Sequence, residues 1–270
     1  MGNKRKIGGV LAIFFLLFML PQMAFAADKE KQKEKEYNFN EEKTVVISEE
    51  KSYAVSDEYT WLKYKSSADG CLTVQVSDPD GTQGGARGYI ALYNSTKSRA
   101  LSPNTIFYNT AHTAKNIWRA FTFGLSKGQE YYLRIRAENA VQITRKFTKI
   151  KDVSGISRAK AKKLNKNKAR TGLIPANSSA ADWYRIDLAK KQKIRLYYSA
   201  NTTGSFKMTV FAGKRRLGSR NISYTAGQKV TIMQSEGQND KKKGMPPGKY
   251  YIKMEQANAL ASGSYKLKWN

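Results

Sequence analysis

Residues 182–188 read Asp-Trp-Tyr-Arg-Ile-Asp-Leu, and apolar and polar side chains alternate through most of this stretch. A period of two is typical of a β-strand, because successive side chains point to opposite faces of a sheet. The alternation places Tyr184, Ile186 and Leu188 on a buried face, and the residue before each of them, beginning with Trp183, on the outer face. Such a strand needs a second layer to cover its apolar side.

The same succession of strands occurs twice along the chain. The first copy opens at Trp61, with Leu62 and Tyr64 expected inward, and in both copies the next alternating strand begins 11 residues after the Trp. A Tyr-Tyr pair follows the two Trp residues after 70 and 67 positions, at Tyr131 and Tyr250. Four further segments match in order: 89–93 with 206–211, 121–123 with 230–232, 128–133 with 248–252, and 146–150 with 265–269. An ordered set of this kind indicates a duplication.

We therefore predict an all-β protein made of two tandem antiparallel β-sandwiches of jelly-roll-like type, with less than about a tenth helix. The first sandwich is expected over residues 37–150 and the second over 160–270, joined by a linker at 151–159. Residues 27–36 are charged and almost without apolar side chains, which predicts a disordered spacer.

The amino terminus has the pattern of a secretory signal peptide. Lys4, Arg5 and Lys6 precede an apolar run at 7–20, and Ala24-Phe25-Ala26 provides a small-x-small cleavage site. The alternative is a membrane anchor, but this run is shorter than the roughly 20 residues that span a bilayer. We predict a signal peptide at 1–26 and a secreted protein, extracellular or loosely attached to the cell surface, with no membrane anchor.

Composition removes most catalytic chemistries. The chain has one cysteine, Cys71, and one histidine, His112, so neither an internal disulfide nor a multi-histidine zinc site is expected. Cys71 begins an alternating strand and His112 lies in a polar stretch, which favours a packed thiol and a loop imidazole over a nucleophile–base pair. We predict no enzyme activity, no cofactor and no catalytic residue.

Positive charge is concentrated in the second half. Residues 27–150 contain 19 Lys and Arg against 15 Asp and Glu, a net of +4, whereas residues 151–270 contain 26 against 6, a net of +20. Such an excess attracts polyanions, although it also suits a solvated surface. The candidate ligand-binding residues fall in clusters, several of them in predicted turns: Lys160, Lys162, Lys163, Lys166, Lys168 and Arg170; Lys190, Lys191 and Lys193; Lys214, Arg215, Arg216 and Arg220; and Lys241, Lys242 and Lys243.

Two weaker candidates remain. The outward aromatic residues Trp61 and Trp183 are candidates for stacking on sugar rings or protein, but their matched positions indicate a shared structural role first. Asp78 and Asp80, in the sequence Asp-Pro-Asp-Gly, are faint candidates for calcium ligands. Because Ca²⁺ takes six or more oxygens, an Asx-type turn is the simpler interpretation.

The second unit resembles the bacterial pre-peptidase C-terminal family of secreted β-sandwich domains. The resemblance covers about 110 residues and is carried by a lead-in at 161–174 and by the segments 182–188, 247–252 and 263–267. The first unit resembles the family through 61–64 and 128–133, so the chain is similar to two tandem copies. The mid-domain Asp of the family is absent from both units, and the lead-in, acidic in calcium-binding relatives, is basic here, which argues against calcium.

Members of that family accompany secreted proteases, and some bind collagen or carbohydrate. The resemblance therefore implies a secreted, non-catalytic binding module, here for an extracellular polyanion, glycan or matrix protein. Nucleic acid is not an expected partner. The alternative is a structural or protein-interaction partner of a separate secreted enzyme, in which the charge serves solubility. A hydrolase is disfavoured because the sequence offers no plausible base and nucleophile.

Overall fold

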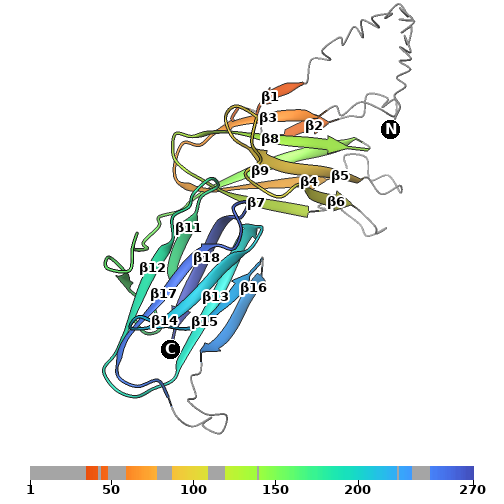
Figure 1. Cartoon of the computed structure of the whole chain (residues 1–270). Helices are drawn as coiled ribbons and strands as arrows, with labels where there is room; N and C mark the ends of the chain where they lie inside the picture. Colours follow the sequence, from red (N-terminus) through yellow and green to blue (C-terminus); the bar gives the residue numbers. More distant parts are fainter. Residues whose placement is uncertain are drawn as a thin grey trace, which may run out of the picture. The chain divides into compact units, whose positions relative to one another are not determined.

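The computed structural model describes residues 35–41, 44–47, 59–77, 87–108, 119–138, 140–223, 225–232 and 244–270, with the side chains of residues 87, 108, 119 and 225–232 excepted. Within these ranges the regular structure is entirely β, as predicted (Figure 1). No helix in the described part of the chain is long and apolar enough to cross a membrane. The predicted signal peptide, residues 27–34 of the spacer, Asp78, Asp80, His112 and Lys241–Lys243 lie outside the described residues.

The first sandwich is formed by two sheets. The five-stranded sheet has the order β1-β3-β8-β5-β6, with β1 at Glu36–Asn38, β3 at Thr60–Lys65, β8 at Glu130–Ala137, β5 at Arg87–Tyr93 and β6 at Thr105–Tyr108. The four-stranded sheet has the order β2-β9-β4-β7, with β2 at Thr44–Ile47, β9 at Val141–Lys149, β4 at Gly70–Ser77 and β7 at Arg119–Leu125.

The second sandwich repeats this arrangement. Its five-stranded sheet has the order β10-β12-β17-β14-β15, with β10 at Lys162–Lys163, β12 at Asp182–Leu188, β17 at Gly248–Gln256, β14 at Phe206–Ala212 and β15 at Arg215–Ile222. Its four-stranded sheet has the order β11-β18-β13-β16, with β11 at Arg170–Ile174, β18 at Ser262–Trp269, β13 at Ile194–Thr203 and β16 at Thr225–Ile232.

The two sandwiches have the same topology strand for strand. β3, which carries Trp61, lies beside β8, and β12, which carries Trp183, lies in the same place beside β17. On its other side each of them pairs with a short parallel strand, β3 with β1 and β12 with β10. The other described pairings are antiparallel. The duplication inferred from the ordered sequence matches is therefore a duplication of the whole strand arrangement.

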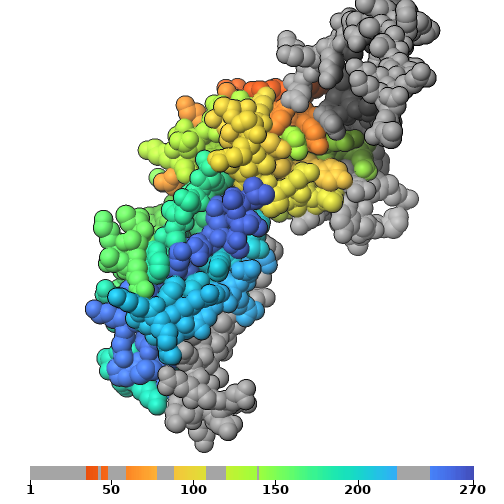
Figure 2. Space-filling model, viewed as in Figure 1, coloured from red at the N-terminus to blue at the C-terminus, as the bar shows by residue number. Residues whose placement is uncertain are grey.

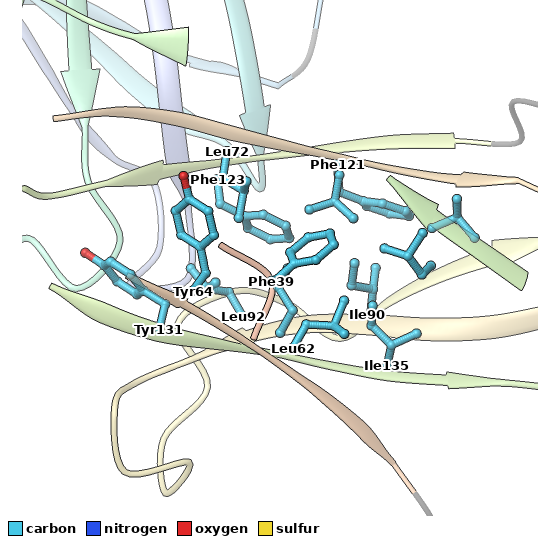
Figure 3. Close-up of a cluster of buried hydrophobic side chains, with 14 of the residues drawn as sticks. Phe39, Leu62, Tyr64, Leu72, Ile90, Leu92, Phe121, Phe123, Tyr131 and Ile135 are labelled. Atoms are coloured by element: carbon cyan, nitrogen blue, oxygen red, sulfur yellow. The ribbon is translucent and has the colours of Figure 1, made fainter. Parts of the chain in front are cut away.

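Each sandwich closes around its own core of inward side chains. In the first, Leu62, Leu72 and Leu92 are fully buried between the two sheets with aromatic residues such as Phe39 and Phe123 (Figure 3). In the space-filling view, side chains fill the spaces between the ribbons of Figure 1 (Figure 2). Burial of this many apolar side chains is what holds a domain without disulfides together.

The core of the second sandwich confirms the pattern of residues 182–188. Tyr184, Ile186 and Leu188 are buried in it, whereas Trp183 and Arg185 are only half-buried on the outer face. In the first sandwich Leu62 and Tyr64 are likewise in the core. Glu36, which the sequence analysis assigned to the spacer, begins β1 and pairs with Trp61.

The free edge of β7 is covered within the chain. The described residues from Lys35 onward belong to one compact unit. In it, the backbone N–H of Ala176 donates to the carbonyl of Gly124 over 2.7 Å, and the N–H of Gly124 donates to Oγ of Ser262 over 3.2 Å. Unpaired backbone N–H and C=O groups at the edge of a sheet favour association with other chains. The two hydrogen bonds satisfy the N–H and the carbonyl of Gly124.

Candidate functional site

The four-stranded sheet of the second sandwich carries positive charge without acidic residues. Its strands β11, β18, β13 and β16 contain no Asp or Glu, and their basic residues are Arg170, Arg195, Lys229, Lys266 and Lys268. The described acids of this half of the chain lie elsewhere: Asp182 in the interior, Asp187 and Glu255 on the five-stranded sheet, and Asp152 in the linker. Among the described side chains, Arg195, Lys266 and Lys268 lie on the outer face of this sheet and give that face positive charge, whereas Arg170 is opposite the buried Leu267 and lies on the inner side.

Three segments that are distant in sequence meet at one end of this sheet. The N–H of Asn167 donates to the carbonyl of Trp269 over 2.8 Å, which fixes the lead-in turn against the carboxyl terminus. Arg195 and Asn270 exchange two backbone hydrogen bonds of 3.0 and 3.1 Å. Asn167 itself adopts a left-handed conformation with φ of 62°, which Asn tolerates better than most residues.

These contacts form an open cleft of about 450 Å³, which we call the cationic cleft. It is lined by Lys166, Asn167, Gln192, Lys193, Arg195 and Asn270. Lys166 is held in place, because its Nζ donates to Oε1 of Gln192 over 3.1 Å and lies 5.8 Å from the centre of the Trp269 ring. The Trp269 ring is fixed in turn, since its Nε1 donates to the Leu164 carbonyl over 2.6 Å.

The chemistry of this lining is that of an anion site. Three cations converge with amide groups that can donate hydrogen bonds, and no Asp or Glu side chain belongs to the lining. Lys and Arg bind phosphate, sulfate and carboxylate groups by charge-assisted hydrogen bonds. The site lies at the surface, so its contacts remain hydrated and sensitive to ionic strength.

The cleft unites residues of two predicted clusters, Lys166 from the lead-in and Lys193 from the turn before β13. Lys166 and Lys168 lie in the lead-in turn, and Lys190 and Lys191 belong to the exposed turn that leads to Lys193. Gly244, which follows the undescribed Lys241–Lys243 in the chain, is in tight contact with Gln192. The sequence grouped these lysines by neighbourhood along the chain, whereas the fold groups them at one end of the sandwich.

The remaining candidates are not brought to this cleft. Lys162 and Lys163 form β10, at one edge of the five-stranded sheet, and Lys163 lies 3.8 Å from Asp187. Arg215 and Arg216 lie in β15 at the opposite edge, next to Lys214. Three strands separate the two edges, which corresponds to roughly 19 Å. Lys160 is exposed directly after the predicted linker, and Arg170 is half-buried at the start of β11.

Trp61 lies on the outer face of its sheet, as predicted, but it is not accessible. Only 4% of its surface is exposed, because Tyr93 and Tyr132 pack edge-on against it and Lys97 lies 5.2 Å above its ring. Lys97 is anchored by a 2.7 Å ion pair with Glu36. This arrangement favours the structural role over stacking on a ligand.

Trp183 occupies the matching position in the second sandwich and is half-buried. It stacks on Phe211 at 5.7 Å, and Lys253 lies 5.9 Å from its ring. Arg158 of the linker lies 5.3 Å from the Phe211 ring and 4.6 Å from that of Tyr251. Both sandwiches thus use the same positions for a cluster of aromatic and cationic side chains.

Cys71 and the acidic side chains of the described part of the chain show how far two residue-specific kinds of chemistry have a structural basis. No group of three or more His, Cys, Asp or Glu residues is close enough to hold a metal ion there. Cys71 is buried, and this burial raises the pKa of its thiol to about 11. The thiolate form that reacts as a nucleophile is therefore scarce at neutral pH.

Sequence reasoning missed six residues of the cleft and of the sheet surface beside it: Asn167, Gln192, Arg195, Lys266, Lys268 and Asn270. The signal was present in the alternation of residues 265–269, Tyr-Lys-Leu-Lys-Trp, which directs both lysines to the outer face. They were passed over because they lie inside strands rather than in dense basic runs. Their grouping with Arg195 depends on which strands are neighbours.

No protein-family model matches the chain, and no curated protein is significantly similar to it in sequence. The pre-peptidase C-terminal domain of a collagenase from Bacillus anthracis is similar in structure over 40% of this chain and 93% of its own, with 12% identity and a TM-score of 0.32. The secreted serine protease VesC from Vibrio cholerae covers 78% of this chain and 50% of its own, with 8% identity and a TM-score of 0.27.

A tandem CBM22 domain pair of Xyn10C from Paenibacillus barcinonensis covers 83% of this chain and 89% of its own, with 7% identity and a TM-score of 0.21. TM-scores this low carry no argument about what the chain does. The functional proposal below rests on the geometry and charge of the second sandwich.

Proposed function

We propose that this protein is a secreted, non-catalytic binding module that holds an extracellular anionic polymer through the cationic cleft. The observation that carries the proposal is the convergence of Lys166, Lys193 and Arg195 in a cleft that no Asp or Glu side chain lines. The four-stranded sheet beside the cleft contains no Asp or Glu, so it extends the positive electrostatic field of the cleft. A field of one sign raises the local concentration of polyanions and speeds their association.

The expected binding is the sum of many weak contacts. Exposed charge pairs contribute roughly 0.2–1 kcal/mol each, so one anionic group bound alone is held weakly. A polymer that occupies several cations at once gains affinity through multivalency. Because the contacts are hydrated, the affinity should fall steeply as ionic strength rises.

The experiment compares matched variants on beads that carry dextran sulfate, a polyuronate or neutral dextran. Lys193→Ser/Arg195→Ser removes two cations of the cleft, and Lys207→Ser/Lys249→Ser removes two lysines from β14 and β17 of the opposite sheet. We expect the first variant to lose binding to both anionic beads and the second to bind as the original protein does. Equal binding by both variants would reject the cleft as the site.

A third variant separates position from total charge. Lys214→Ser/Arg215→Ser/Arg216→Ser removes three cations that belong to an edge of the five-stranded sheet and not to the lining of the cleft. We expect it to retain more binding than the cleft variant. Attachment of the original protein that persists in high salt would instead favour the alternative role, a partner for another secreted protein held by an apolar interface.

A further inference from the structure

A row of cations leads along the outer face of the four-stranded sheet into the cationic cleft. Tyr265, Leu267 and Trp269 of β18 point into the core, so Lys266 and Lys268 between them point outward. Lys266 is exposed and Lys268 half-buried. Arg195 continues the line, because it pairs with Asn270, two residues beyond Lys268. We call Lys266, Lys268 and Arg195 the cationic row.

The spacing of this row is regular. Residues two apart on a strand lie about 6.6–6.8 Å apart, which separates Lys266 from Lys268. Tyr197 is the residue opposite Lys268 in the register, so Arg195 is a diagonal neighbour of Lys268, at about 7–8 Å. Arg195 also lines the cleft with Lys193 and Lys166. A linear ligand that follows the row therefore meets one cation at each step and then enters the cleft.

The geometry points to an extended phosphodiester polymer of the polyol phosphate kind, lying along the cationic row with one end in the cleft. This inference rests on the proposed function and names its ligand. The step of the row is about twice the 3.4 Å rise per phosphate in one strand of a stacked duplex, so it suits a chain whose units are not stacked. Each compact Lys ammonium acts as a point charge toward a phosphate.

The same face disfavours a nucleic acid strand. Proteins that bind single strands usually supply aromatic rings on which the bases stack. Among the described side chains on this face, Tyr197 supplies the aromatic ring next to the row, and this ring already has partners within the protein. Nζ of Lys268 lies 5.1 Å from the ring centre, and Nδ2 of Asn270 donates to the Tyr197 hydroxyl over 3.2 Å. On this face a ligand would therefore be recognised by its negative charge and not by base stacking.

The test measures binding of fluorescent glycerol phosphate oligomers of increasing length at several ionic strengths. Lys266→Ser/Lys268→Ser is compared with the original protein and with Lys207→Ser/Lys249→Ser, which makes the same change of charge on the opposite sheet. Thermal midpoints equal to that of the original protein confirm that each variant is folded. Both lysines of the row are on the outer face, so folding should survive.

We expect the row variant to bind long oligomers about 2- to 30-fold more weakly at low ionic strength. The slope of log affinity against log salt should become shallower by about 1.4, because two phosphate contacts are lost. Short oligomers that fill only the cleft should be bound as before. The control variant should keep the salt slope of the original protein.

Two results would overturn the inference and leave the proposed function intact. The first is a row variant indistinguishable from the control while Lys193→Ser/Arg195→Ser still loses binding. The second is tighter binding of a single-stranded oligonucleotide than of a glycerol phosphate oligomer of equal charge. Failure of the original protein to bind any anionic polymer would reject the proposed function itself, and the inference with it.

Discussion

The hydroxyl of Tyr265 donates a 2.6 Å hydrogen bond to Oδ2 of Asp182 inside the second sandwich. A second hydrogen bond of 3.0 Å joins the hydroxyls of Tyr265 and Tyr184, and Oγ of Ser154 donates to Oδ1 of Asp182 over 2.8 Å. This network ties the linker and β12 to β18. Burial, with a smaller effect from the charge of Asp152, raises the pKa of the Asp182 carboxyl from 3.8 to about 7.

The first prediction concerns pH. In the unfolded chain Asp182 ionises near its ordinary pKa, whereas in the folded protein it holds its proton up to about pH 7. The folded state therefore binds more protons across this window, so the free energy of unfolding should fall as pH rises from about 4 to about 7 and then level off. The total effect is on the order of a few kcal/mol.

Denaturant titrations at a series of pH values measure this dependence. Asp182→Asn should remove most of the decline, because the amide cannot ionise. Asp187→Asn is the matched control, since Asp187 lies five residues further along β12 in a half-buried ion pair with Arg185. A decline of the same size in the Asp182→Asn protein would contradict the prediction.

The second prediction concerns the tyrosine hydroxyl. Tyr265→Phe keeps the ring but leaves Oδ2 of buried Asp182 without the donor that the hydroxyl supplied. Leaving a buried polar group unsatisfied costs about 1–3 kcal/mol. Tyr197→Phe, on the half-buried outer face of the same sheet, should change stability by no more than about 0.5 kcal/mol. Unfolding free energies of the two variants near neutral pH test this difference, and equal values would refute it.

A third prediction follows from the contact between Gly172 and Tyr265. The two residues are paired across β11 and β18, and a Cβ atom at Gly172 would lie 2.6 Å from Cε1 of the Tyr265 ring and closer still to its hydroxyl. Gly172→Ala should cost about 1–3 kcal/mol through overpacking. At Gly218 of β15 a Cβ atom would meet nothing within 4 Å, so Gly218→Ala should be nearly neutral. Chemical denaturation of both variants decides the point.

The fourth prediction compares the contributions of Trp61 and Trp183 to the stability of the protein. Trp61 is almost fully buried by Tyr93, Tyr132 and Lys97, so Trp61→Ala should destabilise the protein by about 3–5 kcal/mol. Trp183→Ala should cost less, because its ring is half-exposed. Calorimetric scans of the two variants provide the comparison. A Trp61→Ala protein as stable as the original would restore Trp61 as a candidate for ligand contact.

Much of the fold could be predicted from local pattern. The alternation in residues 182–188 placed Tyr184 and Ile186 in the core, and the structure confirms both positions. The position of Trp61 was predicted on the correct face, but its burial was not. Side-chain direction follows from backbone geometry, whereas exposure depends on what lies above the side chain, and Lys97 reaches the ring from 36 residues further along the chain.

The all-β class, the duplication and the excess of positive charge in the second half follow from periodicity, segment order and composition, which can be read from the sequence because they are local or additive properties. Which charges act together follows instead from the arrangement of the strands. Lys166, Lys193 and Arg195 meet because β18 and β13 are neighbours and their ends are joined through Asn270. Lys163 and Arg215 belong to one sheet but lie at its two edges. Strand order is set by the packing of two sheets around a shared core, and no stretch of sequence records it alone.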